Sequence, residues 1–106
     1  MNTTITPLAI AKLLILLHDE QSSGEKLAFR VIPLTSGCST PSFALEITER
    51  HPAWEEVLIE GILFTFPSVD RVWMEGLVID FQHENNRFSI YHPNPPFLSD
   101  CQLPPL

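Results

Sequence analysis

The sequence predicts an α+β domain made mostly of antiparallel β-structure, with one helix near the N-terminus and one short helix later. Three observations support this prediction. One long apolar segment follows a helix-capping pair, about six short runs alternate like strands, and turn-forming residues separate those runs. At 106 residues, the chain is long enough for one domain with one core.

The N-terminal segment predicts a short strand and then a helix. Thr3-Thr4-Ile5 is interpreted as the strand, and Thr6-Pro7 starts the helix with a capping hydroxyl and a proline at the first helical position. We expect the helix to end near His18 or Asp19. Apolar residues cover nearly all of its faces, so we expect burial on more than one side, under a loop of this chain or against a second subunit. Burial within the chain's own core is the preferred alternative.

Cys38 lies in a segment of small and turn-forming residues, 36–41, between two runs that predict strands, 26–34 and 42–48. The cysteine is therefore expected at the tip of a strand–loop–strand unit. Gly37, just before it, allows the backbone to approach whatever the sulfur holds. Apolar and polar residues alternate along the second strand, and its apolar face carries Phe43, Leu45 and Ile47.

The second half of the chain predicts a hairpin, a short helix and two more strands. Residues 56–60 and 62–66 form the hairpin around Gly61. Residues 67–74 form the short helix, because a proline begins the segment and a glycine follows it. The remaining strands are expected at 77–82 and 87–91.

The last residues predict a tail outside the sheets. Five prolines occur from His92 onward, and proline cannot donate to a strand ladder. We therefore divide the chain into a domain of residues 1–92 and a flexible, proline-rich tail, 93–106, that carries Cys101.

Composition excludes several classes of function. The net charge is −7, and the six Lys and Arg residues are scattered, which argues against binding nucleic acid or an anionic membrane. The apolar stretch 8–17 has no basic segment before it and is too short to span a bilayer. Two cysteines make no disulfide framework, so we expect a reducing, cytoplasmic compartment.

The loop with Cys38, the hairpin around Gly61, the short helix and the tail follow one another in an order that resembles a known family. This family is the A-type iron–sulfur carriers, which have the HesB/IscA-like domain. The family's G-C-S-G-F-x-Y-x-L loop and strand corresponds to residues 37–45. Its later glycine corresponds to Gly61, its Y-L-x-G helix end to 73–76, and its I-D-Y to 79–81. The family's N-P-N and C-G-C tail resembles His92-Pro93-Asn94 and Ser99-Asp100-Cys101. The resemblance covers most of the chain, in order and nearly without gaps.

The resemblance implies a carrier of an iron–sulfur cluster or iron, and not an enzyme. The family uses three cysteines; here Cys38 falls on the first, Cys101 on the last, and Ser99 on the middle one. A cluster takes four thiolates, so two per chain imply a homodimer. The resemblance to the family implies that this dimer exchanges clusters with scaffold proteins and apo-targets. His92, where the family has asparagine, is a further candidate iron ligand, although an exposed histidine at a strand end is the preferred interpretation.

Other interpretations stay open. Having lost the middle cysteine, the chain is alternatively a degenerate HesB-like interaction or regulatory module without a cluster. Cys38 as a redox or nucleophilic centre is a weaker hypothesis, since no base adjoins it in the sequence. A disulfide between Cys38 and Cys101 is conceivable under oxidation. The sequence contains no Ser–His–Asp spacing, phosphate-binding loop or C-x-x-C pair.

Overall fold

The computed structural model describes residues 1–20, 26–34 and 41–95 of the chain. Cys38, Ser99 and Cys101 lie outside these described residues. Within them, the predicted order of elements is confirmed, with a 3-10 turn and α2 in place of the single short helix expected over 67–74. The elements are β1 (Thr4–Ile5), α1 (Pro7–Glu20), β2 (Leu27–Leu34), β3 (Ser42–Glu49), β4 (Glu55–Ile59), β5 (Ile62–Phe66), the 3-10 turn (Ser68–Asp70), α2 (Arg71–Met74), β6 (Val78–Gln82) and β7 (Arg87–Tyr91).

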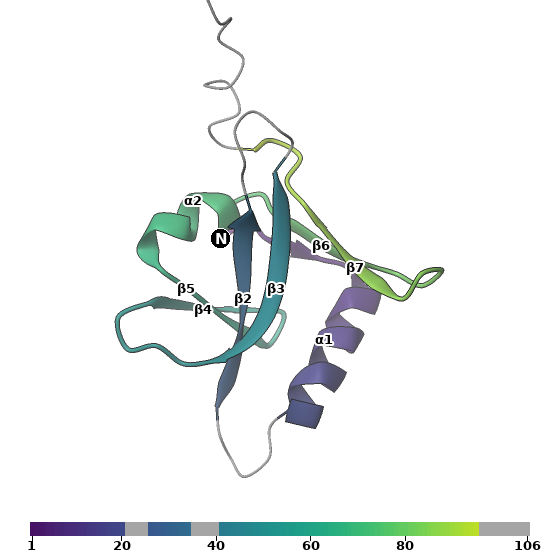
Figure 1. Ribbon diagram of the computed structural model, residues 1–106, viewed down its shortest axis with the longest axis horizontal. Coiled ribbons are helices and arrows are strands. Elements are labelled where there is room, and N and C mark those ends of the chain that lie inside the picture. Colours follow the sequence, from purple (N-terminus) through teal and green to yellow (C-terminus); the bar gives the residue numbers. More distant parts are fainter. Residues whose placement is uncertain (21–25, 35–40, 96–106) are drawn as a thin grey trace, which may run out of the picture.

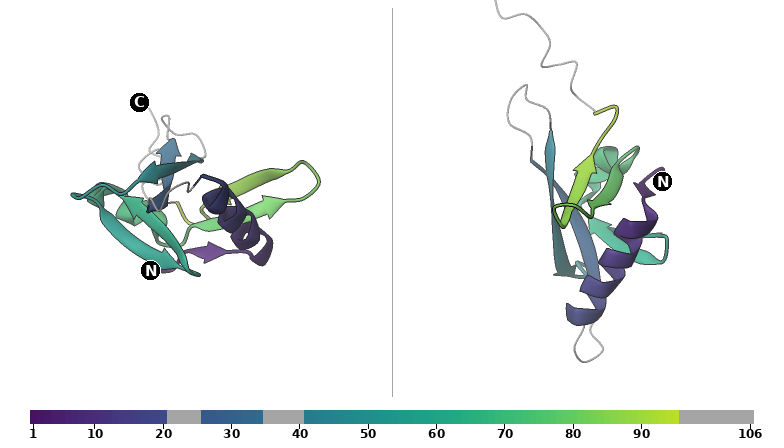
Figure 2. Two further views of the ribbon diagram at one scale, coloured as in Figure 1. Left: turned by 90° about the horizontal axis from the view of Figure 1, so that it is seen from below. Right: turned by 90° about the vertical axis from the view of Figure 1, so that its right-hand side faces the viewer.

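The strands form two mixed sheets that share one core (Figure 1). One sheet has the order β3-β2-β5-β4 and the other the order β1-β6-β7. Most pairings are antiparallel, while β1 with β6 and β2 with β5 are parallel. α1 contacts β6 of one sheet and β5 of the other, and so joins them (Figure 2). The predicted α+β class is confirmed, and the described strands do not close into a barrel.

The β2–β3 ladder is the longest in the fold among the described residues. It runs without interruption from Leu27 opposite Glu49 to Leu34 opposite Ser42. The alternation predicted for β3 is confirmed, because its apolar face packs against the core. Leu34 and Ser42 are cross-strand partners, so the end of β2 and the start of β3, which flank the segment 35–40, lie side by side.

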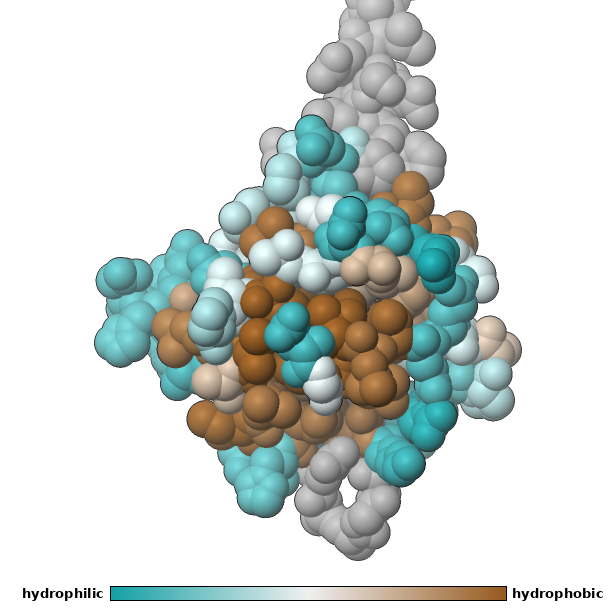
Figure 3. Space-filling model, turned by 180° about the vertical axis from the view of Figure 1, so that it is seen from behind, coloured by the Kyte–Doolittle hydropathy of each residue, from teal (hydrophilic) through white to brown (hydrophobic). Residues whose placement is uncertain are grey.

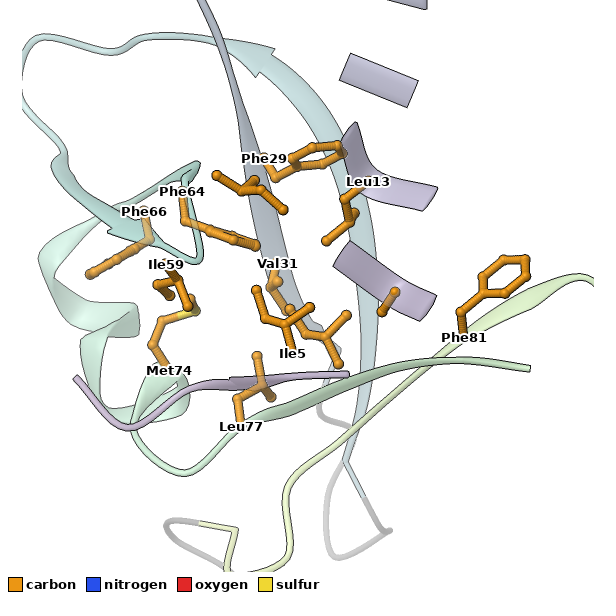
Figure 4. Close-up of a cluster of buried hydrophobic side chains, with 13 residues drawn as sticks. Ile5, Leu13, Phe29, Val31, Ile59, Phe64, Phe66, Met74, Leu77 and Phe81 are labelled. Atoms are coloured by element: carbon orange, nitrogen blue, oxygen red, sulfur yellow. The ribbon is translucent and has the colours of Figure 1, made fainter. Parts of the chain in front are cut away.

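Aromatic and branched side chains from both sheets fill the core (Figure 4). Phe29 of β2 and Phe64 of β5 meet with ring centroids 6.0 Å apart, across the one register pair that joins these strands. Thr65 is the one buried polar residue in the described ranges, and its hydroxyl donates to the Glu55 carbonyl oxygen at 3.0 Å. Burying apolar surface stabilises the fold by roughly 25 cal/mol per Å².

Within the described residues of this chain, α1 is buried on one side and not on several sides as expected, and burial against a second subunit stays a prediction. Only Ala9 and Leu13 are buried in this helix, and Leu14 and Ile15 are 45% and 54% exposed. A single helix face therefore meets the sheets, and no described loop covers the other faces. Figure 3 shows apolar residues gathered across the centre of the back of the molecule, with hydrophilic residues mainly around them. Neither described helix has the length and apolar character needed to cross a bilayer.

The start of α1 is hydrogen-bonded to Asp80 of β6. The Thr6 hydroxyl donates to the Asp80 carboxylate at 2.7 Å, and the Phe81 amide donates to the same oxygen at 2.8 Å. Thr6 Oγ1 also accepts from the Ala9 amide at 3.4 Å, as an N-terminal cap does. The threonine–proline start predicted for the helix is thereby confirmed.

Candidate functional site

The predicted ligands Cys38 and Cys101 lie outside the described residues, so the structure describes the parts of the chain that flank them. Figure 1 shows that the end of β2, the start of β3 and the end of β7 lie at the same end of the molecule. The segment with Cys38 joins β2 to β3, and the segment with Cys101 follows β7. The fold thus brings the departure points of both segments together.

Three rings link these departure points, and we call Phe43, Trp73 and His92 the aromatic bridge. Phe43 of β3 meets Trp73 of α2 edge to face, with centroids 5.9 Å apart and planes at 70°. Trp73 meets the His92 ring at 6.4 Å and 88°. Such edge-to-face pairs contribute about 0.5–1.5 kcal/mol beyond their buried area. The bridge fixes the chain after β7 relative to the start of β3.

His92 is fixed through both of its ring nitrogens. Nε2 lies 2.5 Å from the Glu75 carbonyl oxygen, and the Asn94 amide donates to Nδ1 at 3.2 Å. A carbonyl oxygen only accepts and an amide N–H only donates, so in these two contacts Nε2 is the donor and Nδ1 the acceptor. His92 binds iron only if one of these hydrogen bonds is broken. In this arrangement His92 sets the direction of the chain toward residue 95, and its role as a ligand stays a prediction.

Two features of the structure favour glycine at position 76, and one of them is the neighbouring His92 ring. The φ of Gly76 is +88°, a conformation that residues with a Cβ rarely adopt. A Cβ built on Gly76 would also lie 3.1 Å from Cε1 of His92. The His92 ring therefore lies against the backbone of Gly76, and a Cβ at this position would require the ring to shift by a few tenths of an ångström.

The N-terminus holds this support in place. The Gly76 amide donates to the Asn2 carbonyl oxygen at 3.0 Å, and the Thr3 hydroxyl donates to the Met74 carbonyl oxygen at 2.7 Å. The Asn2 amide donates to the Glu75 carboxylate at 3.1 Å. Carbonyls that a short helix leaves without intrahelical partners are satisfied in this way. These hydrogen bonds hold α2 and Gly76 next to the residues before β1, and so they fix the position of Trp73 and of the backbone below His92.

A hydrogen-bonded ion pair lies at the other end of β3, next to its connection with β4. Arg50 donates two hydrogen bonds to the Glu56 carboxylate, both at 2.6 Å, beside a surface hollow of about 400 Å³. The hydrogen bonds raise the pKa of Arg50 and lower the pKa of Glu56 from their ordinary values. His51 stacks on Trp54 at 4.6 Å in the same hollow. Over the described ranges, no three side chains of His, Cys, Asp or Glu are grouped to hold a metal ion.

Comparisons with known proteins identify the fold. No family model matches the chain, and no curated protein matches its sequence. Among solved structures, SufA of Escherichia coli, described as involved in the biosynthesis of iron–sulfur clusters, superposes with a TM-score of 0.68 at 20% identity. That match covers 91% of this chain and 84% of SufA. A structure of IscA with a [2Fe–2S] cluster superposes with a TM-score of 0.61 at 20% identity, over 89% of this chain and 85% of IscA.

This chain has the fold of SufA and IscA. The superposition depends on backbone geometry, whereas the resemblance in the sequence depends on the order of short motifs, so the two kinds of evidence agree by different routes. The predicted A-type carrier fold is confirmed at this level. At 20% identity, the likeness to SufA and IscA shows the fold, and the roles of Cys38 and Cys101 stay predictions.

Sequence reasoning missed the support beneath His92. Trp73 is partly buried and lies between Phe43 and His92, an arrangement that no pattern in the sequence indicates. Gly76 was interpreted only as a helix stop, whereas it also gives the His92 ring its place. The glycine after the short helix is the one signal in the sequence that could have predicted this contact, since such a glycine often marks the close approach of another group.

Proposed function

We propose that this chain carries iron or an iron–sulfur cluster without catalysing a reaction, and that Cys38 and Cys101 bind the cargo across a homodimer. The observation that carries the proposal is the fold shared with SufA and IscA. In support, Cys38 lies in the β2–β3 connection, at the position where the sequence resembles the family's first cysteine. The IscA structure contains a [2Fe–2S] cluster.

The chemistry of the donors suits this cargo. Iron in clusters prefers soft thiolates, and a [2Fe–2S] unit takes four. Each chain has two cysteines, so two chains related by a two-fold axis supply four. Ser99, where the family has its middle cysteine, is a poor ligand because its hydroxyl rarely ionises.

The length of the chain is compatible with a shared cargo. Cys38 follows Leu34 by four residues, a distance of at most about 14 Å for an extended backbone. Cys101 follows Pro95 by six residues, or at most about 20 Å. The aromatic bridge keeps the two departure points together, which supports the proposal that both cysteines bind one cargo.

Release to an apo-target would be a ligand exchange. A thiolate of the acceptor protein forms a bond to iron as the bond between iron and Cys101 breaks, and the released thiolate takes up a proton. The number of thiolates on iron is unchanged and no electron moves. A ligand that follows the last described strand suits this step, because its departure leaves the described sheets intact.

Anaerobic reconstitution with iron and sulfide tests the proposal. The wild-type protein should become coloured and retain iron and sulfide in equal amounts, and Cys38→Ser and Cys101→Ser should each lose most of both. Ser99→Ala is the matched control and should retain the cargo, whereas Ser99→Cys should increase retention by restoring a third thiolate. A colourless wild-type protein that retains no iron would contradict the carrier function.

A second candidate function has one observation in its favour. Only two of the family's three cysteine positions are occupied here, which favours an interaction or regulatory module that keeps the fold without a cluster. This alternative predicts that the wild-type protein and the Ser99→Ala variant are both folded and retain no iron. Both should still bind the protein partner.

A further inference from the structure

β3 forms an open edge of its sheet. It pairs with β2 on one side, and no described strand forms a ladder with its other side. β3 has eight residues, no bulge in its register, and no proline, lysine or arginine, which are the usual means of protecting an edge from pairing. β4, at the opposite edge of the sheet, has only five residues. Because β7 contacts β3 beside its beginning, the second half of β3 is the part of this edge that is open to an added strand.

A groove runs between this edge and α1. It encloses about 380 Å³ next to the second half of β3. Figure 1 shows β7 beside the beginning of β3 and α1 beside its later part. Leu16 of α1 remains 39% exposed at the groove, although it is a large apolar residue. Apolar side chains dominate the lining and two carboxylates accompany them: the lining residues are Leu16, Glu20, Phe29, Leu45, Glu46 and Ile47.

The carboxylates define the charge of the occupant. Glu20 is exposed, and the Glu46 side chain is 44% exposed. Arg30 approaches Glu46 at 3.8 Å, which is longer than a charge-assisted hydrogen bond, and it also lies 3.7 Å from Asp70. Glu46 thus has capacity for a further cation. The groove and its rim attract an apolar segment that also carries lysine or arginine.

A second copy of this chain is a poor occupant. In the registers that place Glu46 of one copy opposite Glu46 or Glu49 of the other, antiparallel pairing of β3 with β3 of a second copy would bring carboxylates together. Like charges at cross-strand positions are destabilising, and each chain carries a net charge of −7. The charge pattern favours a different protein.

We propose that an extended segment of a partner protein, in which apolar residues alternate with lysine or arginine, adds to the sheet as a strand along β3. Its backbone pairs with the free part of the β3 edge, and one apolar side chain enters the groove beside Leu16. Because neighbouring residues of a strand point to opposite faces, the cations next to it meet Glu46 on the other face of the sheet, and Glu20 adds negative charge at the groove. This inference does not rest on iron binding, because the same surface serves a carrier or a cluster-free interaction module.

Two labelled ten-residue peptides test the proposal by fluorescence anisotropy. In one peptide valine and leucine alternate with lysine, and in the other glutamate replaces each lysine. The full chain should bind the lysine peptide, with binding that weakens as salt is added, and should not bind the glutamate peptide. Amide hydrogen exchange should then slow at residues of β3 between 44 and 48, and not along β4.

Substitutions on the groove separate this mode from other binding. Leu16→Gln and the double charge reversal Glu20→Lys with Glu46→Lys should each weaken the lysine peptide by about tenfold. Leu8→Gln is the matched control, because Leu8 lies on the same helix at 40% exposure and does not line the groove. Equal binding of the two peptides, equal losses for Leu16→Gln and Leu8→Gln, or protection along β4 would overturn the proposal. Self-association through β3 that increases when Glu46 is neutralised would do so as well, by making a second copy the occupant.

Discussion

The core between the sheets and the aromatic bridge are held together in different ways. In the core, Phe64 is fully buried among apolar neighbours from both sheets. In the bridge, Phe43 and Trp73 are partly exposed, and His92 is held by hydrogen bonds to backbone groups as well as by ring contacts. The core thus determines whether the chain folds, and the bridge determines where the two cysteine segments begin.

Truncation of one phenylalanine in each region gives the largest contrast. Phe64→Ala removes a fully buried ring and should lower the free energy of unfolding by about 3–5 kcal/mol. Phe43→Ala removes a partly buried ring and should cost about 1–2 kcal/mol. Urea denaturation of the two variants measures both values. An equal loss would show that the bridge is part of the core and not a separate support.

Alanine at two glycines sharpens the comparison at a smaller scale. Gly61 and Gly76 both have positive φ, so each substitution should cost about 1–2 kcal/mol in backbone strain. Only Gly76 has a neighbour in the way, since nothing lies within 4 Å of a Cβ at Gly61. Gly76→Ala should therefore also shift the NMR resonances of His92, and Gly61→Ala should leave them unchanged. If both variants leave His92 unchanged, the ring does not rest on Gly76.

The smallest effect is expected at the Arg50–Glu56 pair, away from both regions. The hydrogen bond from Arg50 lowers the pKa of Glu56, so the unfolded chain binds this proton more readily than the folded protein does. The pair therefore stabilises the fold above the ordinary pKa of glutamate, and this contribution is lost as the pH falls through the lower folded pKa.

Glu56→Gln should lower the melting temperature at pH 7 by no more than about 2 °C, because the pair is partly exposed. In acid the difference from the wild-type protein should vanish. Glu84→Gln, in the turn between β6 and β7, is the control. A difference that persists in acid would assign the effect to lost packing and not to charge.

Local patterns were sufficient for most of the fold. The alternation in residues 42–48 and the turn around Gly61 are local signals, and both elements formed as predicted. Glu60 shares that turn with φ of 53°, so both central residues have the left-handed conformation of a two-residue hairpin turn. Composition alone could not give the exposure of Leu14 and Ile15, because it depends on which elements pack against α1.

The candidate site was less accessible to sequence reasoning. The prediction that Cys38 and Cys101 are iron ligands depends on their positions in motifs, and both residues lie outside the described residues. The contact of His92 with Gly76 joins residues sixteen positions apart, and Phe43 meets Trp73 across thirty positions. No periodicity within one element predicts such contacts, since the arrangement of the sheets creates them.

The measurement that tests the shared-cargo proposal most directly is thiol alkylation followed by mass spectrometry, with and without iron and sulfide under anaerobic conditions. If Cys38 and Cys101 hold the same cargo, both thiols should become protected together as iron is retained, and Cys38→Ser should expose Cys101. Retained iron with either cysteine still fully reactive would contradict the account.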